Sequence, residues 1–144
     1  MREWTLHGTK EEIVKVDVVF PDEQTIKARC KELVFEIGLP PDMGGDPDAY
    51  GPFDLLLSGL ALCTGHQVRA FLQERGLPID QAGLVVSAER SPDSHLLEKI
   101  SFELRVPEEL PEKYDDAVMR AAEKCAVKQQ LGCRPECQVS VTRV

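Results

Sequence analysis

No apolar run in this chain of 144 residues approaches the ~20 residues that a membrane-spanning helix requires. The chain also lacks an excess of positive charge, because 17 Lys and Arg residues stand against 25 Asp and Glu residues, for a formal net charge of -8. Nucleic-acid phosphates are bound by basic surfaces, so we expect neither a membrane nor a nucleic acid as a partner. The first residues lack the apolar core of a secretion signal, which favours a cytoplasmic location.

The sequence contains no internal repeat, low-complexity tract or interdomain linker. It also contains no Gly-x-Ser-x-Gly elbow and no glycine-rich phosphate loop between a strand and a helix. Hydrophobic residues make up 42% and charged residues 29%, which is typical of a globular protein rather than a disordered one. We therefore expect a single domain, residues 1–144, that is long enough to bury an ordinary core.

The five cysteines are an odd number, spread widely along the chain, and do not indicate a disulfide framework. Cys30 falls on the apolar face of a predicted strand and is interpreted as a core residue. Cys133 and Cys137 have roughly the spacing of one zinc-binding pair, but structural zinc usually needs four ligands. Because a second pair is missing, we predict no metal and no other cofactor, and favour a local disulfide or two free thiols there.

The hydrophobic pattern predicts the order strands, long helix, strands, helix, strand, which defines an α+β fold. Strands are predicted, mainly from the alternation of apolar and polar residues, at 14–20, 26–30, 33–37, 84–90 and 97–106. Helices are expected at about residues 53–75 and 111–132. Val139 and Val141 indicate a closing strand.

Residues 38–52 are rich in Gly, Pro and Asp, a composition that leaves no regular helix or strand. A loop of this length in a small domain is usually functional or mobile. A plain surface excursion is the other interpretation, and the sequence leaves both open.

The long helix carries Cys63, the first residue of chemical interest. The first half of this helix, 55–63, is apolar on nearly every side and is expected to be buried all round, whereas its second half is amphipathic. His66 follows Cys63 by three residues and shares its helix face. An imidazolium beside a thiol favours the thiolate, which is the nucleophilic form. A buried, inert cysteine beside a surface histidine is the alternative.

The second helix carries Cys125 on an apolar stripe. The stripe has spacings of four, three and four residues and consists of Tyr114, Val118, Ala121 and Cys125. Cys125 is therefore predicted to face the core. Two core-facing cysteines on two helices of one domain could meet, although spacing alone does not show that they do.

Two segments resemble motifs of the OsmC/Ohr family, the osmotically induced and organic hydroperoxide resistance proteins. Residues 51–64, Gly-Pro-Phe-Asp-Leu-Leu-Leu-Ser-Gly-Leu-Ala-Leu-Cys-Thr, resemble the family's central helix, in which a cysteine precedes Thr or Phe. Residues 122–131 resemble its second motif, a helix with a cysteine before Val-x-x-x-Leu. The Gly44-Gly45 loop and the strand order also match, so the resemblance covers nearly the whole chain.

The resemblance implies an OsmC-like fold, with antiparallel sheets packed around a long central helix, in an intertwined homodimer with two active sites at the subunit interface. It also implies a thiol-dependent peroxidase. Cys63 would attack an organic hydroperoxide and become a sulfenic acid, with which Cys125 would condense to a disulfide. A dithiol reductant such as a lipoyl-protein would then reduce the disulfide.

Peroxidase members of the family place an arginine in the first hairpin turn and a glutamate at the start of the central helix. Here that turn has no arginine, so the resemblance leaves Arg29, Arg69 or His66 to supply the cation. Asp54 matches the glutamate, but nine residues along a straight helix, ~13.5 Å, separate it from Cys63. A contribution of Asp54 to the site would therefore require the partner subunit or a kinked helix.

Two other functions are kept as alternatives. The chain could be a redox-active or redox-sensing OsmC-like protein that is modified reversibly at Cys63 without peroxidase turnover. It could instead bind a small hydrophobic ligand between the apolar helix and the loop at residues 38–52, in which case neither cysteine would be needed.

Overall fold

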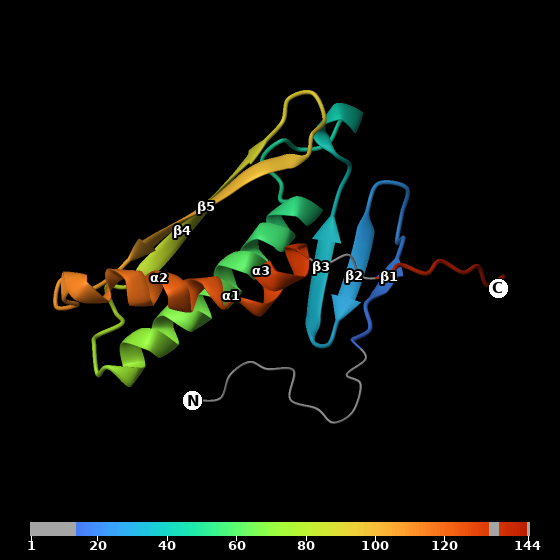
Figure 1. Cartoon of the computed structure of the whole chain (residues 1–144). Helices are drawn as coiled ribbons and strands as arrows, with labels where there is room; N and C mark the ends of the chain where they lie inside the picture. Colours follow the sequence, from blue (N-terminus) through green and yellow to red (C-terminus); the bar gives the residue numbers. More distant parts are fainter. Residues whose placement is uncertain (1–13, 133–135, 144) are drawn as a thin grey trace. The chain divides into compact units, whose positions relative to one another are not determined.

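The computed structural model describes residues 14–132 and 136–143, and the chain divides into two compact units. The first unit ends at Ser58 and the second begins at Gly59. The element order in Figure 1, strands followed by a long helix, a β-hairpin and further helices, confirms the predicted α+β class. Because each unit is compact by itself, the expectation of a single domain stays a prediction.

The first unit contains a three-stranded antiparallel sheet in the order β1-β2-β3. The strands are β1 (Asp17–Val19), β2 (Ile26–Cys30) and β3 (Leu33–Ile37). Lys27 and Glu36 are partners in the register of β2 and β3, and their side chains form an ion pair of 3.0 Å between Nζ and Oε2. Alternation of apolar and polar residues therefore located this sheet correctly.

Two details of the sheet differ from the prediction. The first strand is shorter than the expected segment 14–20, because its ladder with β2 covers only Asp17–Val19. Cys30 is partly exposed rather than buried in a core. It pairs with Leu33 at the end of the hairpin, beside the tight turn, where solvent reaches both residues.

The predicted irregular loop follows β3 and contains a single short 3-10 turn, η1 (Pro41–Met43). A Cβ added to Gly45 would collide with the backbone carbonyl of Leu39, so this tight path accepts only glycine. Near the end of the loop, the backbone amide of Glu36 donates a hydrogen bond of 3.1 Å to the Tyr50 hydroxyl. This bond ties the loop to β3 just before the long helix begins.

The long helix, α1 (Pro52–Glu74), lies within one residue of its predicted bounds. Its first half is not buried all round as predicted, since Leu56 is 40% and Leu62 76% exposed. The buried residues follow spacings of three and four and form one stripe, so the opposite face of the helix stays outside the core of this chain. The stripe consists of Leu60, Thr64, Val68, Phe71 and Leu72.

By length and mean composition alone, α1 could also cross a bilayer. This was not predicted from the sequence, because only unbroken apolar runs were considered. The core helix of a soluble protein satisfies the same criterion. Three residues of the buried stripe of α1, Val68, Phe71 and Leu72, pack in the core of the second unit. The cytoplasmic location stays a prediction.

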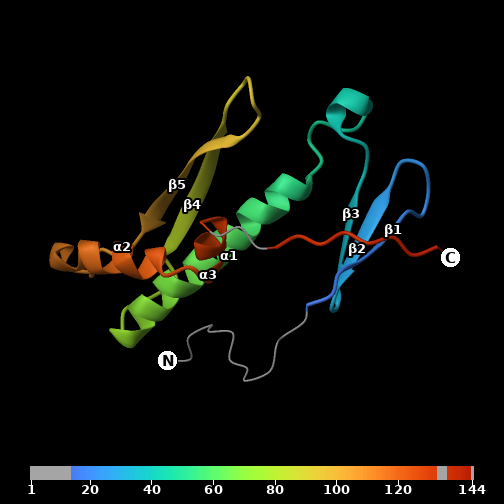
Figure 2. The same cartoon turned by 45° about the vertical axis from the view of Figure 1, so that its right-hand side comes forward.

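The second unit combines the rest of α1 with the predicted hairpin and with three short helical pieces. The hairpin is antiparallel and consists of β4 (Gly83–Arg90) and β5 (Leu97–Arg105). The predicted second helix is broken into η2 (Glu112–Tyr114), α2 (Asp115–Glu123) and α3 (Ala126–Leu131). Figures 1 and 2 both show α3 beside the middle of α1.

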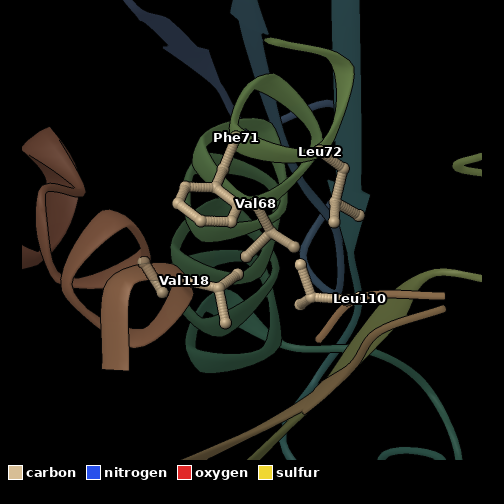
Figure 3. Close-up of a cluster of buried hydrophobic side chains, with 6 residues drawn as sticks. Val68, Phe71, Leu72, Leu110 and Val118 are labelled. Carbon is tan, nitrogen blue, oxygen red and sulfur yellow. The ribbon is translucent and has the colours of Figure 1, made fainter. Parts of the chain in front are cut away.

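The core of the second unit lies between α1, α2 and the segment before η2. Figure 3 shows its apolar side chains converging, and each is at most 7% exposed. Its labelled members are Val68, Phe71, Leu72, Leu110 and Val118. This cluster fixes the second half of α1 against α2.

The predicted closing strand is wrong for the described residues 136–143, which form no strand. The side chains of Val139 and Val141 are 94% and 80% exposed. A strand needs a neighbouring strand for its backbone hydrogen bonds. No strand of the described chain pairs with this segment.

Candidate active site

α1 places Cys63 at the boundary between the core and solvent. Cys63 is partly exposed, and its neighbours differ sharply, since Leu62 is 76% exposed and Thr64 is fully buried. A Cβ added to Gly65 would lie 3.2 Å from Cδ2 of Leu84, so the helix approaches β4 closely at this point. The glycine thus allows α1 to pack on the hairpin directly after the cysteine.

Cys125 is fully buried, as predicted, but it lies at the break between α2 and α3 rather than inside one helix. It is the N-cap residue of α3, with an extended backbone (φ -61°, ψ 118°). Its sulfur accepts a hydrogen bond of 3.3 Å from the backbone amide of Lys128, a donor that the first turn of a helix leaves without a backbone partner. The Lys128 ammonium lies 4.0 Å from the centroid of the Phe102 ring, which holds α3 against β5.

The structure brings Cys63 and Cys125 together, close enough for each thiol to change the pKa of the other. Burial raises the pKa of Cys63, and the contact with Cys125 raises it further, although two backbone amides of α3 act in the opposite direction. Burial also acts to raise the pKa of Cys125. Contacts with Cys63, the Lys128 amide and Thr64 outweigh it and hold the pKa of Cys125 below its ordinary value.

Thr64 contributes a buried hydroxyl to this site. Within the described chain its Oγ1 has no partner that meets hydrogen-bond geometry, yet it lies close enough to the Cys125 sulfur to lower the pKa of that thiol. A thiol is a weak acceptor, whereas a charged sulfur accepts strongly. Ionisation of Cys125 would therefore give the Thr64 hydroxyl the partner that a buried polar group requires. The sequence prediction missed Thr64, although it directly follows Cys63 in the quoted motif.

His66 has a different partner from the one predicted. Its Nδ1 lies 3.1 Å from Nη2 of Arg69. Because a guanidinium only donates, Nδ1 is the acceptor in this contact. Activation of Cys63 by His66 stays a prediction.

Asp54 and Arg29, the other predicted site residues, belong to the first unit, so their roles beside Cys63 stay predictions. Oδ2 of Asp54 accepts a hydrogen bond of 2.7 Å from the backbone amide of Gly51. An acid in the first helical turn that bonds back to the amide before the helix stabilises its start. Asp54 therefore has a structural role at the start of α1, and Arg29 is an exposed residue of β2.

The part of the chain that the structure describes contains no group of three or more His, Cys, Asp or Glu side chains placed to hold a metal ion. Cys133 lies outside the described residues. The alternatives predicted for Cys133 and Cys137, a local disulfide or two thiols, therefore stay open. The expected absence of a metal also stays a prediction.

A partly exposed cysteine on a long helix, next to a buried cysteine at the cap of a short one, defines an α+β protein with a dithiol site. The model of the family described as OsmC-like protein matches residues 45–140, which include both cysteines. The chain therefore belongs to the OsmC-like protein family.

Solved structures of this family share the fold at low sequence identity. The OsmC like protein from Mycoplasma pneumoniae has a TM-score of 0.63 at 18% identity, over 85% of this chain and 89% of that chain. An organic hydroperoxide resistance protein from Elizabethkingia anophelis has a TM-score of 0.57 at 13% identity, over 85% of this chain and 90% of that chain. The organic hydroperoxide resistance protein OhrB of Bacillus subtilis has a TM-score of 0.52 at 21% identity, over 83% of this chain and 90% of that chain. No curated protein matches the chain in sequence.

Proposed function

We propose that this protein is a thiol peroxidase that reduces organic hydroperoxides through Cys63 and Cys125. Membership of the OsmC/Ohr family suggests a role in hydroperoxide resistance. The observation that carries the two-cysteine mechanism is the close approach of the two side chains, which interact with each other. Sulfur atoms in such contact need little movement to reach the length of a disulfide bond.

In the proposed cycle the Cys63 sulfur attacks the terminal oxygen of the hydroperoxide, and the O–O bond breaks. Cys63 is oxidised to a sulfenic acid, while the hydroperoxide is reduced to an alkoxide that takes a proton and leaves as the alcohol. Cys125 then condenses with the sulfenic acid, which forms the disulfide and releases water. A dithiol such as a lipoyl-protein would reduce the disulfide. The partial exposure of Cys63 and the burial of Cys125 support this assignment, because the substrate reaches Cys63 first.

The test treats fully reduced protein with an equimolar amount of cumene hydroperoxide and maps the cysteine products by mass spectrometry. We expect a Cys63–Cys125 disulfide and a matching loss of hydroperoxide. Cys30→Ser is a suitable control, because Cys30 is also partly exposed but takes no part in the proposed cycle. Unmodified Cys63 with the hydroperoxide intact would contradict the proposal and direct attention to the binding of a small hydrophobic ligand.

We also propose that the protein is a homodimer, because each unit exposes several large apolar side chains. In the first unit, four strand residues are between 51% and 61% exposed: Val18, Val19, Leu33 and Val34. In the second unit, Leu62 is 76% exposed directly beside Cys63. Val18 and Leu33 lie on the same face of the sheet as Ala28, and an exposed apolar face usually marks an interface. A partner subunit that covers these residues would also shield the dithiol site from solvent.

Sedimentation over a dilution series tests the dimer. We expect one species with twice the chain mass of 16.0 kDa, and loss of folded protein when the dimer dissociates, because the exposed apolar residues then lack their cover. Far-ultraviolet circular dichroism on the same dilutions reports folding. A compact, folded monomer at nanomolar concentration would contradict the intertwined architecture.

A further inference from the structure

We infer that Lys128 is a positioning residue of the dithiol site: its ammonium, held over the ring of Phe102, keeps the first turn of α3 against the two cysteines. The part that this anchor plays in a peroxidase cycle rests on the function proposed above. Its hold on the dithiol does not depend on hydroperoxide chemistry. All the residues involved belong to the second unit.

The helix α3 is held in place by contacts other than a buried apolar face. It has only six residues, fewer than an isolated helix needs to be stable in water, and none of them is buried. Most helices in proteins draw their stability from an apolar face that packs in the core. The specific contacts of the first turn therefore matter more for the position of α3 than such contacts do for a longer, buried helix.

Lys128 makes two of these contacts, one through its backbone and one through its side chain. Its amide donates to Sγ of Cys125 at 3.3 Å, and its Nζ lies 4.0 Å from the centroid of the Phe102 ring. Lys128 and Phe102 are both partly buried, so solvent weakens the cation–π attraction less than at an open surface. Phe102 pairs with Val86 in the middle of the antiparallel ladder of β4 and β5. One residue thus links the cap at Cys125 to a paired strand.

The same turn of α3 also serves the other cysteine. The amides of Val127 and Ala126 lie close enough to Cys63 to favour its thiolate. Cys125 itself is the N-cap residue of this turn. Displacement of the turn would therefore change the surroundings of both sulfur atoms and move Cys125 away from its partner. Because a disulfide forms only within a narrow range of geometry, the anchor acts on the step in which Cys125 attacks an oxidised Cys63.

This step is measured with the aromatic disulfide DTNB, in protein that carries Cys30→Ser, Cys133→Ser and Cys137→Ser. The Cys63 thiolate attacks the reagent, which releases one thionitrobenzoate and leaves a mixed disulfide on Cys63. Cys125 then attacks the Cys63 sulfur, so the protein disulfide forms and a second thionitrobenzoate leaves. Both thiol protons go to solvent, and the reagent takes up the two electrons. The second release is recognised because its rate does not depend on the concentration of the reagent.

The charge on Lys128 is tested by a matched pair of substitutions. Lys128→Gln removes the charge but keeps the backbone amide and a similar helix propensity. We expect the second release to slow by about three- to tenfold, the range of a partly buried cation–π contact. Lys128→Arg, whose guanidinium also lies well over an aromatic ring, should stay within about twofold of the parent rate. An unchanged rate in Lys128→Gln would overturn the inference, and so would a parent protein that gives no second release.

The ring is tested separately, because Lys128 could instead act through its charge on a thiolate. Phe102→Leu keeps the charge and removes the aromatic face, and we expect it to slow the second release by a similar factor. The double variant with Lys128→Gln should be no slower than the slower single variant, since both remove one contact. An unchanged rate in Phe102→Leu, or effects that simply add, would overturn the inference.

Leu72→Ala separates positioning from a general loss of stability. It weakens the core cluster of the second unit without touching the Lys128 contacts, and the second release should stay within about twofold of the parent rate. Equal slowing in Leu72→Ala would show that the rate reports stability, and the inference would fail. Because DTNB is not a hydroperoxide, a protein without peroxidase activity would still give this result. Hydroperoxide turnover with an unchanged second release in Lys128→Gln would overturn the anchor alone.

Discussion

Replacement of Cys63 by serine is expected to abolish the turnover of cumene hydroperoxide in the presence of a dithiol. A serine hydroxyl does not ionise near neutral pH and cannot enter a sulfenic acid and disulfide cycle. Loss of the attacking atom from a catalytic group typically costs on the order of 10⁴-fold or more in rate. The remaining hydroperoxide, measured over time with dithiothreitol as the reductant, reports the effect.

Two companion variants make this result specific. Cys30→Ser should retain the parent rate, because the proposed cycle uses only Cys63 and Cys125. Without reductant, Cys125→Ser should consume no more than about one equivalent of hydroperoxide per chain, since nothing resolves the sulfenic acid. Sustained turnover by Cys63→Ser would show that another group carries the chemistry.

Leu72→Ala is expected to lower the free energy of unfolding by about 2–5 kcal/mol, the usual cost of emptying a buried leucine site. Leu72 is fully buried in the core cluster of the second unit, between α1 and α2. Its truncation removes apolar contacts and leaves a cavity that the packed cluster fills only in part. Urea denaturation at one fixed protein concentration measures the change, because the stability of an oligomer depends on concentration.

Leu96→Ala is the matched control, since Leu96 is 69% exposed in the turn between β4 and β5. The same chemical change there should alter the free energy of unfolding by no more than about 0.5 kcal/mol. A loss below about 1 kcal/mol for Leu72→Ala would mean that the cluster in Figure 3 contributes little to stability.

Local signals made the long helix the most predictable element. Pro52 is the first residue of α1, where proline is well tolerated. Gly76 follows its end with a φ of 64°, and the next amide, that of Leu77, bonds back to the carbonyl of Leu72 at 3.1 Å. Both boundaries depend on residues close in sequence, so reasoning from the sequence could find them.

Burial was predicted less well, because apolar character does not say which neighbour covers a residue. Leu62 lies in the most apolar stretch of the chain and is nevertheless 76% exposed. Val139 and Val141 alternate like a strand, yet they have no strand partner among the described residues. In each case the missing information is a long-range contact, within the chain or from a second subunit.

The dithiol site was also predicted only in part, because it too depends on contacts between segments far apart in the sequence. The helix break at Lys124 and Cys125 contains neither glycine nor proline, and cysteine is not a usual helix cap. The break is stabilised by the contact of the Cys125 sulfur with the Lys128 amide. Sequence could therefore place both cysteines on apolar faces, but it could not show that the two side chains meet.

The unequal burial of the two cysteines also bears on how a disulfide between them would be opened again. Thiol–disulfide exchange requires access to the attacked sulfur, and it is faster when the departing sulfur forms a stable thiolate. Cys63 is partly exposed, whereas Cys125 is fully buried and accepts the Lys128 amide. An incoming dithiol would therefore form its mixed disulfide at Cys63, with Cys125 as the leaving group. The reductive half of the cycle acquires a fixed direction from the difference in solvent access between the two cysteines.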